Sequence, residues 1–215
     1  MTRVLGVDGC RGGWVGALVE GDQVTWHRFP DIGSAVAMAV DAIGVDMPVG
    51  LPARGRRDCD LLAKAALGRA HSRVFLAPPR GVLSAETYDE AGRLHRVLTG
   101  GLGMSVQTWH LVPKIREVDE VADDHRLFEV HPELSLAELA GTGPLVSKKT
   151  PAGRAARTAV LRGWLPGLAD VPAGDDGLDA LAAAWSAGRW LAATARSLPE
   201  HPAYDERGRP MRIVT

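Results

Sequence analysis

Short apolar runs separated by glycine-rich turns dominate the first part of the chain. Residues 4–7 and 14–19 have the length and β-branched content of buried strands, and residues 24–29 form a third, alternating run. The glycines between the first two runs permit a tight reversal, and Gly21 with Asp22 marks a hairpin turn before the third. The pattern therefore predicts three consecutive antiparallel strands.

A helix and a fourth strand follow. Asp31 stands where an N-cap would lie, before an Ala- and Val-rich helix that we expect to run to about Ala42. Residues 43–45 are a short apolar strand ending at Asp46, and the Pro- and Gly-rich loop after it cannot continue a helix or a sheet. Because βαβ connections are short and right-handed, we expect the fourth strand to lie parallel to the first and beside it.

The pattern between the fourth strand and the next one is irregular. Helices are predicted over 59–67 and 84–98, and a further helix from Gln107 leads to a basic turn at 113–116. We interpret residues 75–124 as an insertion that covers a functional site, within a single domain that spans residues 1–198. The polar residues 199–215 are expected to form a loosely ordered C-terminal tail.

The later part of the chain predicts a fifth strand and further helices. The fifth strand covers residues 126–131. Thr150 and Pro151 suit the N-cap and the first position of a helix. The final helix begins near Asp176 and is expected to run to about Ala195.

Acidic residues recur at the ends of these elements. Asp8 follows the first strand, Asp46 follows the fourth, and Glu129 interrupts the fifth. Asp176 and Asp179 are three apart at the start of the last helix, so they project from nearly the same face. Each acid alone has a structural explanation as a turn residue, an N-cap or a partner of the helix dipole. Their convergence at one sheet edge, where α/β sheets bind ligands, is not explained in that way.

A divalent cation is the expected occupant of such a cluster. Carboxylates held together raise one another's pKa values unless a cation lies among them. Mg²⁺ and Mn²⁺ prefer oxygen ligands, and two such ions about 4 Å apart can hold a phosphodiester for in-line attack by water. No Cys or His spacing suggests zinc instead. We expect catalytic roles for Asp8, Asp46, Glu129 and Asp179, with Asp176 as a further metal ligand.

Two residues beside the fifth strand are candidates for supporting roles. Glu133 is an alternative ligand that ranks below Glu129, because Glu133 also suits the first turn of a following helix. His131 is a candidate donor to a metal ligand, or a general acid or base. Both residues are therefore expected in a second layer around the carboxylates.

The overall charge limits how the chain can bind nucleic acid. Its 215 residues carry a formal net charge of -1, so any contact with phosphates requires a local basic patch. Lys148 and Lys149, next to a predicted helix N-terminus, are the best phosphate-binding candidates, and Arg154 follows in the same segment. The expected partner is a nucleic acid or nucleotide substrate.

The remaining sequence features concern the compartment. The two cysteines, Cys10 and Cys59, form neither a metal-binding spacing nor a disulfide framework, which indicates a reducing compartment. No apolar run approaches the roughly 20 residues that span a bilayer, and no signal peptide is recognisable. We expect a soluble, cytoplasmic protein that does not bind membranes, and the sequence leaves its oligomeric state open.

Five motifs along nearly the whole chain resemble the uncharacterised-domain family 429, which is described as predicted nucleases with an RNase H-like fold. The resemblance implies an α/β fold with a mixed five-stranded sheet whose first three strands are antiparallel, flanked by helices, with an insertion between strands four and five. It also implies metal-dependent phosphodiester cleavage in the manner of RNase H and RuvC-like enzymes. The motifs are GVDGCRGGWVGALV at 6–19, GVDMPVGLP at 44–52, FEVHPE at 128–133, KKTPAGR at 148–154 and DDGLDALAAAW at 175–185.

The same resemblance distributes roles among the acids. Asp8 is expected to hold both metal ions, Asp46 and Glu129 to complete the ligand shell, and Asp176 and Asp179 to bind the second ion. Two other functions stay open at this point. One is a non-catalytic binding module on the same scaffold, and the other is an actin- or sugar-kinase-like phosphoryl transferase, for which the chain lacks a second duplicated domain.

Overall fold

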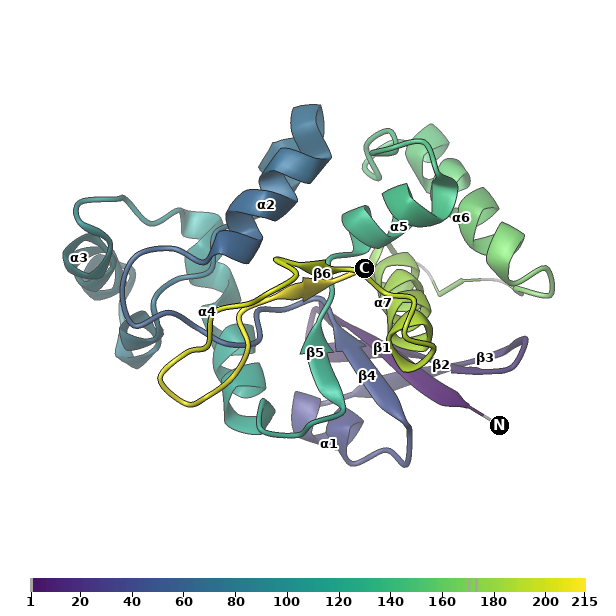
Figure 1. Ribbon diagram of the computed structural model, residues 1–215, viewed down its shortest axis with the longest axis horizontal. Helices are drawn as coiled ribbons and strands as arrows, with labels where there is room; N and C mark the ends of the chain where they lie inside the picture. The colour runs from purple at the N-terminus through teal and green to yellow at the C-terminus, as the bar shows by residue number, and fades with distance from the viewer. Residues whose placement is uncertain (1, 170, 173) are drawn as a thin grey trace. The chain divides into compact units, whose positions relative to one another are not determined.

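The protein contains a mixed five-stranded sheet (Figure 1). The computed structural model describes residues 2–169, 171–172 and 174–215. The sheet has the strand order β3-β2-β1-β4-β5, with β1–β3 antiparallel and β4 and β5 parallel to β1. The predicted mixed sheet with three antiparallel strands at its start is therefore confirmed. Its strands are β1 (Arg3–Cys10), β2 (Gly13–Glu20), β3 (Gln23–Phe29), β4 (Ala42–Val45) and β5 (Leu127–Glu129).

The chain divides into two compact units. The first comprises the chain up to Met47 together with Asp124–Arg196 and Val214–Thr215. The second comprises Pro48–Asp123 and Ser197–Ile213. The second unit thus begins earlier in the chain than the predicted insertion, and it includes much of the segment that the sequence presented as a tail.

The helices of the first unit cover its sheet. They are α1 (Ile32–Val36), α5 (Pro132–Ala140), α6 (Pro151–Trp164) and α7 (Asp176–Leu191). Helix α7 packs directly against β1, β2 and β4, and α5 and α6 pack against α7 (Figure 1). Ten residues of α7 are buried, six of them alanine or glycine, so the helix backbone lies very close to the sheet.

Glycines on the sheet make this close approach possible. A Cβ atom at Gly6 of β1 would lie 1.9 Å from the Ala180 carbonyl oxygen of α7, and one at Gly44 of β4 would lie 2.7 Å from the Ala183 carbonyl oxygen. Any side chain at either position would push α7 off the sheet. The position of α7 is therefore set by the small residues on both surfaces.

The second unit is mostly helical. Its elements are α2 (Asp58–Leu67), η1 (Gly68–Arg73), η2 (Arg80–Ser84), α3 (Tyr88–Thr99), α4 (Val106–Val121) and β6 (Ser197–Leu198), and β6 pairs with β7 (Ile213–Val214). Asp119 joins its helical part to the segment after β6, because this buried carboxylate pairs with Arg80, Arg207 and Arg209. These ion pairs help to hold two segments that are far apart in the sequence.

Three sequence-based expectations about these elements are wrong. Helix α1 ends at Val36 instead of Ala42, because the Asp41 amide donates to the Arg3 carbonyl oxygen (2.8 Å) and Ala42 already pairs with β1. Strand pairing here overrides the helical preference of alanine. There is no basic turn at 113–116, because α4 continues through Pro113 to Val121 with Ile115 and Val118 buried.

The third error concerns the C-terminal segment. The expected loosely ordered tail instead carries β7, in which Ile213 and Val214 are buried. Asp205 in this segment is buried and accepts hydrogen bonds from the amides of Leu51 and Arg209. Polar composition hid this order, because the polar groups are satisfied within the fold.

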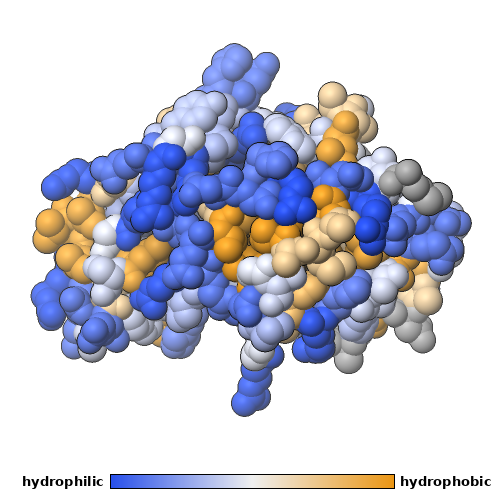
Figure 2. All heavy atoms as spheres, turned by 90° about the horizontal axis from the view of Figure 1, so that it is seen from below, coloured by the Kyte–Doolittle hydropathy of each residue, from blue (hydrophilic) through white to orange (hydrophobic). Residues whose placement is uncertain are grey.

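Hydrophilic side chains cover most of the face that Figure 2 shows, with hydrophobic side chains gathered between them. Most large apolar residues belong instead to the buried cores, including Trp14, Leu5 and Ile43. Among the described residues, no helix has both the length and the apolar character needed to cross a bilayer.

Candidate metal centre

Strands β1 and β4 bring Asp8 and Asp46 together. Asp8 lies near the C-terminal end of β1, and Asp46 follows β4 directly, where its amide donates to the Val7 carbonyl oxygen at 2.9 Å. Side chains alternate along a strand, so Asp8 shares a face with Gly6 and Asp46 shares one with Gly44. Both glycines lie against α7, so the two carboxylates are on the side of the sheet that α7 covers.

Helix α7 supplies the third acid. Asp179 is in the first turn of α7 and only 1% exposed. Ala183, whose carbonyl group lies over Gly44, is four positions further along the helix, so both residues occupy the helix face that meets the sheet. One carboxylate oxygen from each of Asp8, Asp46 and Asp179 lies within 4.8 Å of the others. The sequence-predicted acids on three different elements are thus close enough to share one cation.

The environment of these acids disfavours their charged forms. Burial raises the pKa of Asp8 well above its usual value of 3.8, and the neighbouring charges of Asp46 and Asp179 raise it further. The pKa of Asp46 is raised well above 3.8 by its burial and then by Asp179. The lysine ammonium at 148 partly offsets both effects. Burial and mutual repulsion therefore favour the protonated forms of Asp8 and Asp46.

Lys148 provides the positive charge of the site. Its ammonium group forms an ion pair with the Asp179 Oδ2 atom. Burial alone would lower the pKa of Lys148, but the fields of Asp179, Asp8 and Asp46 outweigh it, so this pKa is raised and the ammonium stays charged. Asp179 itself has a raised pKa, because its burial outweighs the effect of Lys148.

A divalent cation fits this arrangement. The Asp179 Oδ1 atom is buried and has no hydrogen-bond partner among the described residues. A buried carboxylate oxygen without a partner is costly, and a bound cation would satisfy it. The three nearby carboxylates offer only oxygen, which is the donor set that Mg²⁺ and Mn²⁺ prefer.

Glu129 and Asp176 lie outside the tight group of three. Glu129 pairs with Val45 in the parallel ladder, so it shares a face with Val45, whereas Asp46 follows on the opposite face. The negative charge of Glu129 still raises the pKa of Asp46, and that of Asp176 raises the pKa of Asp8. Both acids are therefore near the centre, but within the described part of the chain their oxygens do not join the group that Asp8 defines.

Glu133 belongs to a buried ion pair next to the centre. It lies in the first turn of α5, and both of its carboxylate oxygens accept hydrogen bonds from the Arg157 Nη2 atom at 2.6 and 2.8 Å. Its negative charge raises the pKa values of both Asp46 and Asp179. His131 is the N-cap residue of the same helix. Glu133 thus raises the pKa values of two acids of the centre, whereas Glu129 raises that of Asp46.

The basic segment before α6 is built around a tight turn. The Thr150 hydroxyl caps α6 by accepting from the Gly153 amide at 3.1 Å, and it donates to the Ser147 carbonyl oxygen at 2.9 Å. This turn directs Lys148 to Asp179, whereas Lys149 is exposed. The half-exposed side chain of Arg154 instead forms an ion pair with Asp175 at 2.9 Å. Only one of the three predicted phosphate-binding side chains therefore reaches the acids.

Arg157 is the important residue that the sequence reasoning missed. It is fully buried, and together with Gly153 and Leu161 it forms the buried stripe of α6. Arg157 lies four positions before the apolar Leu161 and therefore on the same helix face. An arginine on an apolar helix face indicates a buried carboxylate partner, because arginine is rarely buried unless it is paired. Its partner, Glu133, is in the first turn of a neighbouring helix, where the sequence suggested a ligand or a partner of the helix dipole.

One family model matches most of the chain. It is described as "Protein of unknown function (DUF429)" and covers residues 6–204. No curated protein and no solved structure matches the chain. The matched range contains every residue of the carboxylate centre described above.

Proposed function

The chain belongs to the family of proteins of unknown function DUF429, and from its carboxylate centre we propose that it is a metal-dependent phosphodiesterase. The proposed cofactor is Mg²⁺ or Mn²⁺, and the proposed substrate is a nucleic acid or a nucleotide. The observation that carries this proposal is the group formed by Asp8, Asp46 and Asp179, with an unpartnered buried oxygen on Asp179 among the described residues. The free cysteines, Cys10 and Cys59, support a reducing, cytoplasmic location.

Each residue of the centre has a role in the proposed reaction. Asp8, Asp46 and Asp179 would hold the cation through their convergent oxygens. A bound Mg²⁺ or Mn²⁺ supplies Lewis-acid stabilisation of the charge that develops on the phosphoryl oxygens. The partly exposed ammonium of Lys148 provides a positive charge for a phosphate oxygen, and the carboxylates around it hold its pKa above the usual value.

The surrounding residues would tune this centre. Glu133 raises the pKa values of two of the acids, and its pairing with Arg157 fixes its position. Glu129 and Asp176 are proposed as further ligands or as carboxylates that attract the cation. His131, the N-cap residue of α5, is proposed as a donor to a metal ligand or as a general acid or base. Lys149 and Arg154 are proposed to contact substrate phosphates, since both lie at the exposed side of the same segment.

One observation favours a second candidate function, a binding module without catalysis. The ion pair between Lys148 and Asp179 already places a cation among the acids, so the centre is partly neutral without a metal ion. A site of this kind can recognise a ligand by charge alone. Activity measurements on matched variants distinguish the two functions.

The test is an assay for phosphodiester hydrolysis with Mg²⁺ or Mn²⁺. The substrates are a chromogenic phosphodiester, single- and double-stranded DNA and RNA, and an RNA–DNA hybrid. We expect the wild type to hydrolyse at least one of them and Asp8→Asn to lose at least about a hundredfold in rate, because one carboxylate oxygen and its negative charge are removed from the centre. Asp22→Asn is the matched control, since Asp22 is exposed in the turn between β2 and β3.

Two outcomes would contradict the proposed activity. One is a wild-type protein that binds divalent cations and these substrates without hydrolysing any of them, which would favour the binding module. The other is hydrolysis that persists in Asp8→Asn at the wild-type rate, which would show that the activity does not arise at this centre.

A further inference from the structure

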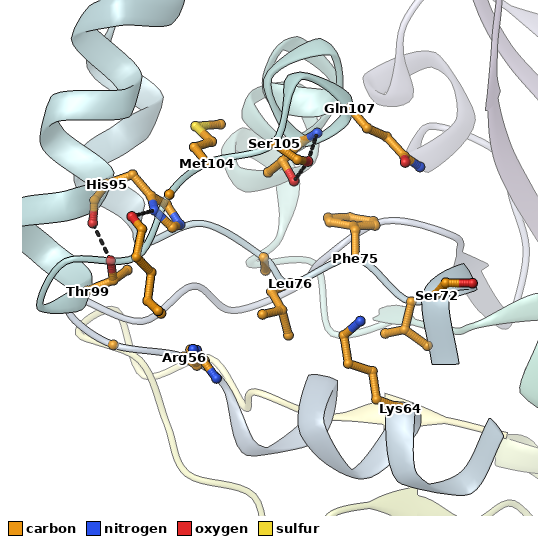
Figure 3. A pocket seen from close by; sticks show the side chains of 16 residues that line it. Arg56, Lys64, Ser72, Phe75, Leu76, His95, Thr99, Met104, Ser105 and Gln107 are labelled. Atoms are coloured by element: carbon orange, nitrogen blue, oxygen red, sulfur yellow. Dashed lines mark hydrogen bonds between the residues drawn. The ribbon is translucent and has the colours of Figure 1, made fainter. Parts of the chain in front are cut away.

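The second unit contains a cavity of about 330 Å³, which falls within the size range of small-molecule sites (Figure 3). It is formed by parts of α2, α3 and α4, by residues 55–56, by the end of η1 with the loop after it (72–77) and by the segment 102–105. None of its sixteen lining residues is an aspartate or a glutamate. The cavity is thus a separate feature from the carboxylate centre, with the opposite charge preference.

Two cationic side chains line the cavity. Lys64 of α2 has its ammonium near the cavity wall, where it donates to the His71 carbonyl oxygen at 3.2 Å. Arg56 is exposed, and among the described residues its guanidinium group has no hydrogen bond or ion pair. An arginine beside a cavity without carboxylates favours an anion, and guanidinium groups bind phosphate oxygens in pairs.

The cavity also has an apolar wall with polar groups beside it. Figure 3 shows Phe75, Leu76 and Met104 between the helices, with Arg56 and Lys64 toward one side of them. Phe75 is half-buried, so part of its ring stays open to a flat ligand. The side chains of Gln107 and Ser72 have no hydrogen-bond partner in the described ranges of the chain, so both are available to a ligand.

The remaining polar residues of the cavity are already fixed. The buried His95 has its Nδ1 atom 3.0 Å from the Leu102 carbonyl oxygen, and the Thr99 hydroxyl donates to the His95 carbonyl oxygen at 2.6 Å. The hydroxyl groups of Ser105 and Thr108 are 2.8 Å apart. These contacts hold the walls in place, so the cavity is largely formed before a ligand enters.

We propose that this cavity binds a mononucleotide, with the base against Phe75 and the phosphate held by Arg56 and Lys64. A nucleotide combines the three properties that the cavity selects: a flat aromatic ring, a hydrogen-bonding edge for the Gln107 amide, and an anionic group. Base stacking on an aromatic side chain and phosphate binding by arginine contribute separately to the binding free energy, so a single substitution can remove either one. The cavity needs no metal ion for this binding, and therefore the inference does not depend on the proposed phosphodiesterase activity.

The experiment is calorimetric titration of the full chain in EDTA with adenosine 5′-monophosphate and uridine 5′-monophosphate. Adenosine, uridine and inorganic phosphate are titrated in parallel. We expect at least one nucleotide to bind, and its nucleoside and phosphate parts to bind at least about tenfold more weakly. Arg56→Gln and Phe75→Ala should each weaken nucleotide binding by about tenfold, because each removes one of the two contributions.

Arg54→Gln is the matched control, since Arg54 is an exposed arginine two residues away that does not line the cavity. It should bind the nucleotide within about twofold of the wild type. Circular dichroism establishes that each variant is folded before it is titrated. The inference is overturned if neither nucleotide binds, if inorganic phosphate or the nucleoside binds as tightly as the nucleotide, or if folded Arg56→Gln and Phe75→Ala both bind like the wild type.

Discussion

Replacing Gly6 by alanine perturbs the contact that brings the acids together. A Cβ atom at this position would lie 1.9 Å from the carbonyl oxygen of Ala180 and 2.2 Å from the amide nitrogen of Ala184, both in the backbone of α7. Overpacking usually costs about 1–3 kcal/mol when side chains can give way. Here a helix backbone must move, so we expect a loss of about 3 kcal/mol or more in the free energy of unfolding.

This loss corresponds to a decrease of about 6–12 °C in Tm for a chain of this size. Thermal unfolding followed by circular dichroism measures it. Gly188→Ala in α7 is the matched control, because a Cβ atom at that position would have no neighbouring atom within 4 Å among the described residues. We expect that control to stabilise the protein by about 0.5–1 kcal/mol, since alanine is the better helix former.

The displacement should also separate Asp179 from Asp8, so folded Gly6→Ala is expected to bind Mn²⁺ more weakly than the wild type does. The reasoning is refuted if Gly6→Ala unfolds within about 1 °C of the wild type, because α7 would then not rest on this glycine. A loss of stability without any change in Mn²⁺ affinity would show that the close packing does not set the position of Asp179.

Three further predictions concern the charges around the centre. Arg157→Met should lower the free energy of unfolding by about 3–5 kcal/mol, because it leaves Glu133 buried without its partner. In a denaturant titration, the double variant Arg157→Met/Glu133→Leu should recover most of this loss. A double variant as unstable as Arg157→Met would contradict the pairing. Without metal at neutral pH, Asp8→Asn should be more stable than the wild type in a denaturant titration, because burial raises the folded-state pKa of Asp8 above 3.8 and ionisation of this group therefore favours the unfolded state. Since the penalty develops as the pH rises from 3.8 through the raised pKa, the difference should disappear as the pH falls toward 3.8, and a difference that grows in acid would contradict it. Lys148→Gln should increase the Mn²⁺ affinity severalfold and decrease hydrolysis, because the wild-type ammonium competes with the ion for Asp179. A lower Mn²⁺ affinity of the variant, measured by calorimetry, would show that Lys148 instead supports cation binding.

The sequence predicted the sheet well because its signals are local. The alternating apolar runs and the glycine turns between them predicted the three antiparallel strands β1–β3, and the structure has these pairings. The short apolar run before Asp46 predicted β4, which pairs in parallel with β1 as expected. The extent of α1 was not predictable in the same way. Its end depends on the pairing of Asp41 and Ala42 with β1, which is a tertiary interaction.

The candidate site shows the same division. Strand ends and a helix start predicted where Asp8, Asp46 and Asp179 would lie, because sheet edges collect such residues. Side-chain direction was harder to predict for Glu129, whose face depends on its register opposite Val45. The buried partner of Glu133 was missed because the arginines of α6 resemble a solvated surface in the sequence, although Arg157 lies on the buried stripe of that helix.

The most direct measurement is calorimetric titration of the metal-free protein with Mn²⁺ at neutral pH, for the wild type, Asp8→Asn and the exposed-acid control Asp22→Asn. The convergence of three carboxylates within 4.8 Å predicts that the wild type and Asp22→Asn bind the ion equally and that Asp8→Asn binds it at least about tenfold more weakly. A wild-type protein that binds no Mn²⁺, or an Asp8→Asn variant that binds it as tightly, would contradict the assignment of this centre as a metal site.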